Sequence, residues 1–324
     1  MQQLLILLPT LLFCFYAGLK EFGHNQSQWL RYSTLMTKIR MEPGEYRVIV
    51  GNSYIYSGID PKVLNQGEDR YLIFAVGSKF CPGLLNYLKD NLLLPKEVIC
   101  DLSVRDLEGS YRLNLDAIFP KSQDPFDAFK SKVEVNSRLL AEKYLPFLSY
   151  NFSIINVFEQ IKDGSVLNLF RMSLNSSQDD IGVSRKKYYQ NGFVEDLEEY
   201  TPGEIEARSS AYFRSFMKES HGSKFHIEST ITEIRKLVDW YAKNEVKVSF
   251  IRLPRSQEIV DYEDSNFADL FNGLEKMMIE KELDYLDLTK DQEIMKQSRK
   301  LLSDGAHWTS RGAHYISSIL RSSL

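Results

Sequence analysis

A repeated alternation of short apolar runs with helical segments is the feature that most constrains the fold of this chain. Strands are predicted at residues 46–53, 71–77, 97–103, 247–254 and 284–289, and the first two are apolar runs of the kind that buried strands show. Helices are predicted at residues 60–67, 81–93, 230–244, 266–283 and 308–324, the first with Asp60 as its N-cap and Pro61 in its first turn. The alternation predicts an α/β fold, with three α/β/α layers built on a parallel five-stranded sheet.

One long segment, residues 107–228, does not follow this alternation. It is rich in Tyr, Phe, Ser and charged side chains, and contains helical stretches such as residues 126–145. We interpret it as a helical insertion between the third and fourth strands, which either forms a lid or substrate wall or only decorates the fold. Its tyrosines either pack or stack on sugars. The expected organisation is a domain of residues 46–324 that contains this insertion, preceded at residues 21–45 by a stalk or short helix that leads into the domain.

The N-terminal segment, residues 1–20, departs from globular composition because residues 4–19 are apolar and uncharged. It is interpreted as a signal peptide or a membrane anchor, and the other interpretation is a buried N-terminal helix. No Lys or Arg precedes the apolar run, and bulky Phe15 stands three residues before a cleavage site after Ala17. We therefore favour an uncleaved anchor with the body outside the cytoplasm, in an extracytoplasmic or periplasmic location.

Composition narrows the class of protein further. The 324 residues are 43% hydrophobic and 26% charged, which excludes an intrinsically disordered chain and a multi-span membrane protein. A formal net charge of −4 gives no indication of nucleic-acid binding. Cys14, Cys81 and Cys100 form no CxxC pair, and no histidine pattern is typical of a metal site. Neither a metal nor another cofactor is expected.

Two predicted strands end in residues that can carry chemistry, at the edge where an open parallel sheet places its functional groups. After the first strand, Ser53 follows Gly51 and Asn52. This Ser is either a nucleophile presented on a tight turn or part of a plain turn, since all three residues are turn formers. Gly77 follows the second strand, where its N–H can donate to an oxyanion or its conformational freedom merely ends the strand.

A third group precedes the last predicted helix. Asp304 stands three residues before His307, and a carboxylate at that spacing can orient an imidazole and stabilise its charged form. The same residues also fit a simple loop into the helix, with Thr309 or Ser310 as its cap. Only five histidines occur in the chain, so the position of His307 beside an Asp carries more weight than the spacing alone.

Taken in chain order, the residues after the first strand, after the second strand and before the last helix resemble the conserved sequence blocks of the SGNH/GDSL hydrolase superfamily. Residues 51–53 read Gly-Asn-Ser where that family has Gly-Asp-Ser, and Gly77 stands at the family's oxyanion Gly. Residues 303–317 resemble its C-terminal block, an Asp-x-x-His followed by a polar pair and a Gly, here Gly312. The resemblance covers the two parts of the domain on either side of the insertion.

The resemblance implies a flavodoxin-like sheet and a serine-dependent ester hydrolase or O-acyltransferase. Ser53 is expected to attack an acyl carbon, with His307 as its general base and Asp304 holding His307 in place. The backbone N–H groups of Ser53 and Gly77, together with Arg105, are expected to form the oxyanion hole. Hydrolysis and transfer share the acyl-enzyme, so the sequence does not separate them.

Two departures from the family pattern favour a rival interpretation. Asn52 replaces the Asp of the first block, and Arg105 replaces the oxyanion Asn of the third. Arg is longer and charged, so it changes the geometry of a hydrogen bond to an oxyanion. The rival is a catalytically silent SGNH-fold binding or assembly protein of the cell envelope.

The run at residues 56–61, Tyr-Ser-Gly-Ile-Asp-Pro, is similar to membrane-anchored, cell-envelope members of the superfamily. Those members are similar to proteins that move acyl groups onto envelope polymers. The resemblance therefore implies an acylated envelope polymer or carbohydrate as substrate, and a membrane protein as the donor of the acyl group.

Overall fold

The computed structural model describes residues 28–66, 69–75, 81–107, 186–188, 194–196, 200–220 and 227–324, together with positions 133, 135, 136, 139 and 140. The chain divides into two compact units. The first comprises Met1–Thr37, Leu115–Ser184 and Tyr188–Gln190, and the second comprises Lys38–Asn114, Arg185–Lys187 and Asn191–Leu324. The central sheet and the site described below belong to the second unit.

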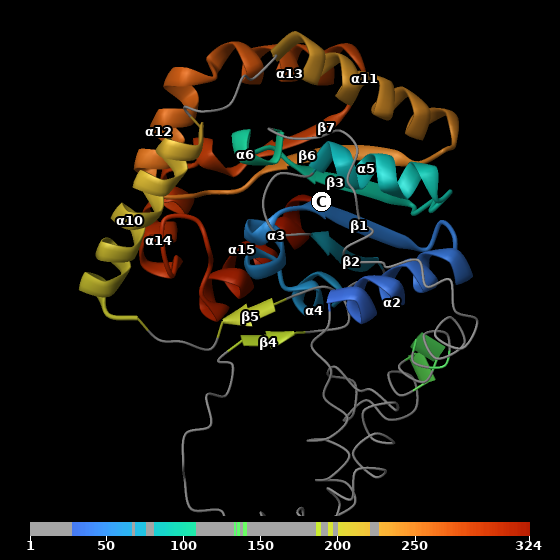
Figure 1. Cartoon of the computed structure of the whole chain (residues 1–324), viewed down its shortest axis with the longest axis horizontal. Helices are drawn as coiled ribbons and strands as arrows, with labels where there is room; N and C mark the ends of the chain where they lie inside the picture. Colours follow the sequence, from blue (N-terminus) through green and yellow to red (C-terminus); the bar gives the residue numbers. More distant parts are fainter. Residues whose placement is uncertain are drawn as a thin grey trace, which may run out of the picture. The chain divides into compact units, whose positions relative to one another are not determined.

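A five-stranded parallel sheet forms the centre of the second unit (Figure 1). Its strands are β1 (Tyr46–Gly51), β2 (Arg70–Ala75), β3 (Glu97–Asp101), β6 (Lys247–Arg252) and β7 (Asp284–Asp287). They lie in the order β2-β1-β3-β6-β7, the strand order of flavodoxin-like doubly wound folds. The predicted α/β fold with a parallel sheet is confirmed. The predicted segments extend two residues past the ends of β1, β3, β6 and β7, because they include the first residues of the turns at the carboxyl edge. The residues that follow Ala75 of β2 lie outside the described part of the chain.

Helices cover both faces of this sheet and give the predicted three layers (Figure 1). One layer contains α5 (Cys81–Asp90), α11 (Ile227–Lys243) and α13 (Ala268–Glu280). The other contains α3 (Ser53–Gly58), α4 (Pro61–Leu64) and α15 (Ser310–Ser323). The strands β1, β2, β3 and β6 are mostly shielded from water on both faces, as the fully buried Val48, Ile49 and Val50 of β1 illustrate, whereas the edge strand β7 is partly exposed.

Several helix predictions need correction, and two helices were not predicted. The helix expected at residues 266–283 is interrupted at Phe267, where α12 (Gln257–Asn266) ends and α13 begins. The helices α12 and α14 (Gln292–Leu301) escaped prediction because each is only 10 residues long and mostly polar. The last helix begins at Ser310 rather than at 308, because Thr309 is its N-cap.

The remaining elements are α2 (Gln28–Met41), α6 (Val104–Leu107), α10 (Pro202–Ser220), the 3-10 helix Leu288–Lys290, and strands β4 (Lys186–Tyr188) and β5 (Val194–Asp196). β4 and β5 pair with each other inside the segment interpreted as a helical insertion, so that segment is not purely helical. Its helical stretch at residues 126–145 lies outside the described residues, apart from five helical positions. The domain boundaries and the role of the insertion stay predictions.

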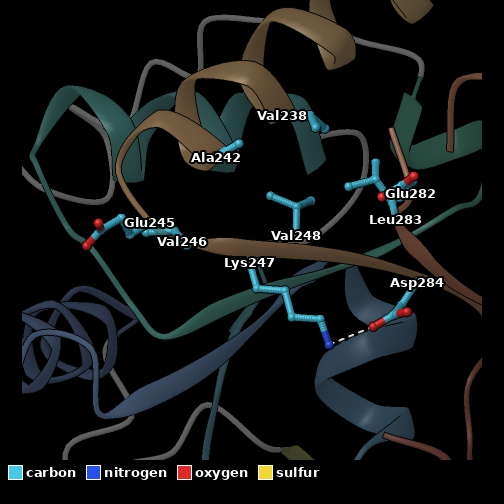
Figure 2. Close-up of a pocket in the computed structure, with 9 residues that line it drawn as sticks. All are labelled: Val238, Ala242, Glu245, Val246, Lys247, Val248, Glu282, Leu283 and Asp284. Carbon is cyan, nitrogen blue, oxygen red and sulfur yellow. Dashed lines mark ion pairs between the residues drawn. The ribbon is translucent and has the colours of Figure 1, made fainter. Parts of the chain in front are cut away.

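Charges of alternating sign run across the amino ends of all five strands. Asp69, beside β2, lies 3.0 Å from Arg47 of β1, and Arg47 lies 3.0 Å from the buried Glu97 of β3. Glu97 lies 3.3 Å from Lys247 of β6, and Lys247 lies 2.6 Å from Asp284 of β7 (Figure 2). Each charge thus faces opposite charges in the observed strand order, which favours this order over one that places like charges side by side.

In the part of the chain that the structure describes, no helix combines the length and apolarity needed to cross a membrane. The predicted N-terminal anchor, residues 1–20, lies outside the described residues and stays a prediction.

Candidate active site

Ser53 is presented at the carboxyl edge of the sheet by the turn from β1 into α3. Asn52 is the N-cap of α3, and its Oδ1 accepts the backbone N–H of Tyr54 at 2.7 Å. An Asp would cap the helix in the same way, so Asn52 keeps this role of the residue it replaces. Gly51 is required because a Cβ there would collide with the side chain of Ile55. In the Gly-Asn-Ser sequence, Gly51 allows the close approach of Ile55, Asn52 caps α3, and Ser53 is the first residue of α3.

The structure brings Ser53, His307 and Asp304 together. Nε2 of His307 lies 2.8 Å from Oγ of Ser53, although 254 residues separate them in the chain. Nδ1 of His307 lies 2.9 Å from Oδ2 of Asp304. A hydroxyl, an imidazole and a carboxylate joined in this order are the components of a serine nucleophile and its base.

The environment of Asp304 keeps its carboxyl ionised. Burial raises its pKa, but the hydrogen bond and charge of His307 and the backbone N–H groups of Ala306 and His307 lower it, so the pKa lies below the ordinary value. Oδ1 accepts both of these N–H groups at 2.8 Å. An ionised Asp304 accepts a hydrogen bond from Nδ1–H of His307, which leaves Nε2 unprotonated and able to accept the proton of Ser53.

Backbone hydrogen bonds hold the loop that carries Asp304 and His307. The N–H of Ser303 donates to the carbonyl of His307 at 2.7 Å, and the N–H of Thr309 donates to the carbonyl of Leu301 at 2.9 Å. Gly312 packs directly on this loop, since a Cβ would lie 2.5 Å from the carbonyl oxygen of Leu301 and 2.6 Å from the buried Trp308 ring. The polar pair and Gly of the C-terminal block thus fix the loop against α15.

The predicted oxyanion hole is described only in part. The backbone of Ser53 lies at the start of α3, and Arg105 lies in α6. Gly77 and the side chain of Arg105 are outside the described residues. The oxyanion roles of all three residues stay predictions.

Two tyrosines beside His307 escaped the sequence reasoning. The rings of Tyr54, in α3, and Tyr212, in α10, each have their centroid 5.6 Å from that of the imidazole, and their hydroxyls are hydrogen-bonded to each other. Tyr54 carried a signal, because it follows Ser53 directly. Tyr212 carried none, because it is one of many tyrosines in the segment interpreted as an insertion.

A buried ion cluster lies next to this site. Glu263 of α12, fully buried, accepts from Arg255 at 2.8 Å and from Arg252 at 3.2 Å, and its other oxygen accepts the backbone N–H of Val104 at 3.2 Å. The guanidinium of Arg255 lies 5.6 Å from the ring centroid of Tyr54. The cluster thus ties the end of β6, the start of α6 and α12 to the residue after Ser53.

A hollow of about 260 Å³ lies at the opposite edge of the sheet (Figure 2). It is formed by the ends of α11 and α13 and the starts of β6 and β7. Two of the four charged residues that line it, Lys247 and Asp284, are paired with each other and belong to the series of charges across the strands. This hollow therefore has no part in the chemistry of Ser53.

Comparisons with known proteins add little to this geometry. No family model matches the chain, and no curated protein matches it. Among solved structures, the chain is similar to the crystal structure of "a putative acylhydrolase" from Bacteroides fragilis. The two are 12% identical, with a TM-score of 0.42, and the match covers 91% of this chain and 96% of the other. A likeness this distant does not identify a function, so the function is argued from the site.

Proposed function

We propose that this protein is a serine-dependent ester hydrolase or O-acyltransferase of the SGNH/GDSL type. One observation carries the proposal, namely the hydrogen-bonded series from Ser53 through His307 to the partly buried Asp304. The series lies at the carboxyl edge of a doubly wound sheet, where such folds hold their reacting groups. An imidazole that accepts from a Ser hydroxyl and donates to an ionised carboxylate makes that hydroxyl a nucleophile.

The proposed reaction begins with attack of Ser53 Oγ on the acyl carbon of an ester, while Nε2 of His307 takes the hydroxyl proton. Asp304 stays ionised and stabilises the imidazolium. The bond between the acyl carbon and the alcohol oxygen of the ester then breaks. That oxygen takes the proton from His307 and leaves as the alcohol, and the acyl group remains on Ser53. Water or an acceptor hydroxyl attacks this acyl-enzyme, gives its proton to His307 and releases Ser53 Oγ, which takes the proton back.

The backbone N–H groups of Ser53 and Gly77, with Arg105, are proposed to stabilise the oxyanion of each tetrahedral intermediate. Removal of one such donor raises the barrier by about 3–4 kcal/mol. We therefore expect the length and charge of Arg105, in place of the family's Asn, to bear on which acyl esters react.

The substrate class that we propose is an acylated polymer or carbohydrate of the cell envelope. The support is the similarity of residues 56–61 to envelope members of the superfamily and the apolar segment at residues 4–19. A body held outside the cytoplasm by that segment would meet such polymers and a membrane protein that supplies the acyl group. Protease protection of an epitope tag at Leu324 in intact spheroplasts would contradict this location.

Labelling of the full-length protein with a fluorophosphonate tests the proposed nucleophile. We expect the wild type to be labelled and Ser53→Ala and His307→Ala to remain unlabelled, because the probe needs the activated hydroxyl. Ser322→Ala, an exposed Ser at the end of α15, is the control and should label like the wild type. Hydrolysis of p-nitrophenyl acetate provides a second measurement with a smaller reagent.

A silent binding or assembly protein of the envelope is the second candidate, and Arg105 at the position of the oxyanion Asn is the observation that favours it. This candidate predicts no labelling that depends on Ser53 and no hydrolysis above that of Ser53→Ala. Either result with folded wild-type protein would contradict the enzyme proposal and favour the binding or assembly protein.

A further inference from the structure

Three rings form a compact group around the imidazole of His307. The centroids of Tyr54 and Tyr212 each lie 5.6 Å from that of His307, and 6.3 Å from each other. All three pairs are edge-to-face, with interplanar angles of 61°, 90° and 69°. Because aromatic pairs favour this arrangement, both tyrosines limit how the imidazole can turn.

The two tyrosines come from different parts of the chain. Tyr54 is in α3, beside the nucleophile Ser53, and is 1% exposed. Tyr212 is in α10, 158 residues later, and its hydroxyl is hydrogen-bonded to that of Tyr54. This contact therefore links α10 to the helix that carries the nucleophile, with His307 packed against both rings.

The loop that carries the triad's Asp and His also touches α10. Nε of Arg208 donates to the carbonyl of Ser303 at 3.0 Å. A Cβ added to Gly305 would lie 3.4 Å from Cδ1 of Tyr212 and 3.5 Å from the carbonyl oxygen of Ser209, so the helix lies close against the loop. Arg208, Ser209 and Tyr212, which lie within little more than one turn of α10, thus contact the segment from residue 303 to residue 307.

We infer that Tyr212 is a positioning residue that holds the imidazole of His307 between Asp304 and Ser53. The inference rests on the proposed function and deepens it, since it assigns to α10 a part in the same site. The side chain of His307 is 28% exposed, so water reaches it, and two hydrogen bonds alone leave an exposed ring free to exchange them for water. The ring of Tyr212 packs against the imidazole of His307, and this packing favours the orientation in which Nε2 faces Ser53.

The neighbouring Phe213 offers a matched control. It is on the same helix and belongs to the same apolar group, together with Phe216 and Ile259, but its ring packs on Tyr262 at 6.2 Å. Phe213→Ala therefore removes a ring similar in size to that of Tyr212 and weakens the packing of α10, but it takes away no ring contact of His307. A loss specific to Tyr212→Ala then separates positioning from general weakening of the helix.

Two measurements on the full-length protein test the inference. The first is the rate of fluorophosphonate labelling of Ser53. We expect Tyr212→Ala to slow it by about 10- to 100-fold, because a displacement of about 1 Å in a reacting group has effects of this size. Tyr212→Phe, which keeps the ring and loses the hydroxyl, should lose at most about tenfold, the effect of one neutral hydrogen bond. Phe213→Ala should label like the wild type.

The second measurement is the tautomer of His307 by long-range ¹H–¹⁵N NMR, at a pH where imidazoles are neutral. Only five histidines are present, and the His307→Ala spectrum identifies the signal. We expect one tautomer, with the proton on Nδ1, in the wild type and Phe213→Ala, and a mixture of tautomers in Tyr212→Ala. Tyr212→Leu, which keeps an apolar side chain, replaces Tyr212→Ala if the latter does not fold.

The inference is overturned if Tyr212→Ala or Tyr212→Leu keeps the wild-type rate and tautomer, or if Phe213→Ala shows the same losses. Failure of the proposed function gives a different result, because an unreactive wild type abolishes the labelling comparison but leaves the tautomer measurement intact.

Discussion

Replacement of Asp304 by Asn separates the two tasks of this carboxylate. Its Oδ1 accepts the N–H groups of Ala306 and His307 at 2.8 Å each, and its Oδ2 lies 2.9 Å from Nδ1 of His307. The oxygen of an Asn can still accept both backbone N–H groups. Its NH₂ group then faces Nδ1, which must accept a hydrogen bond and therefore carries no proton. The imidazole proton moves to Nε2, where it donates to Ser53 and cannot take the hydroxyl proton.

The expected size of each effect follows from these contacts. An Asp-to-Asn change in a serine triad lowers kcat by about 10⁴-fold through the wrong tautomer, equivalent to a barrier about 5 kcal/mol higher. Asp304→Asn should therefore be nearly inactive but change the free energy of unfolding by less than about 1 kcal/mol, because the backbone hydrogen bonds remain. Asp304→Ala also removes the acceptor of both N–H groups and should lower stability by about 2 kcal/mol, since the side chain is only 14% exposed.

The assay combines the rate of fluorophosphonate labelling or ester hydrolysis with urea unfolding of each variant. Asp291 offers a matched control, because its Oδ1 accepts the N–H groups of Glu293 and Ile294 at 2.9 and 3.0 Å at the start of α14, with no imidazole attached. Asp291→Asn should keep both activity and stability, and Asp291→Ala should lose about 1 kcal/mol of stability and no activity. The reasoning is refuted if Asp304→Asn reacts within tenfold of the wild type.

Three further predictions concern the loop, the sheet and acid stability. Gly312→Ala should lose about 1–3 kcal/mol of stability and slow the labelling of Ser53, because the new methyl group displaces the triad loop; Gly203→Ala, with open space around it, should melt like the wild type. Glu97→Gln should lower the free energy of urea unfolding by about 3 kcal/mol, because it leaves the partly buried Arg47 and its neighbours without the central negative charge. A loss under about 1 kcal/mol would contradict a role of the charge series in stability. The folded-state pKa of Asp304 lies below its ordinary value of 3.8, so its ionised form stabilises the fold above that pH and the contribution is lost as the pH falls through the folded-state pKa. Urea unfolding at decreasing pH should therefore show a steeper loss for the wild type than for Asp304→Asn, and parallel curves would disprove this linkage.

The strands β1 and β2 were predictable because each is a mainly apolar run, which is favourable in a strand buried on both faces. The strand β7, with two Asp and partial exposure, was predictable only from its place in the alternation of strands and helices. Helix boundaries were harder to predict. The break at Phe267 depends on a backbone conformation that no Pro or Gly signals in the sequence, and α14 is mostly polar. The strand order was also beyond the sequence pattern, since the alternating charges that accompany it become neighbours only when the strands pair.

The sequence by itself determined the two local parts of the site. Asn52 caps the helix that begins at Ser53, and Asp304 accepts the N–H of His307 three residues later, so each arrangement is closed by contacts within a few residues. Only the tertiary structure decided that these two parts meet at 2.8 Å, because the loop of Asp304 and His307 lies between α14 and α15, and the packing of α15 on α3 brings it to Ser53. It also decided that Tyr212 packs on the imidazole, since that contact depends on where α10 crosses the loop and leaves no pattern in the sequence.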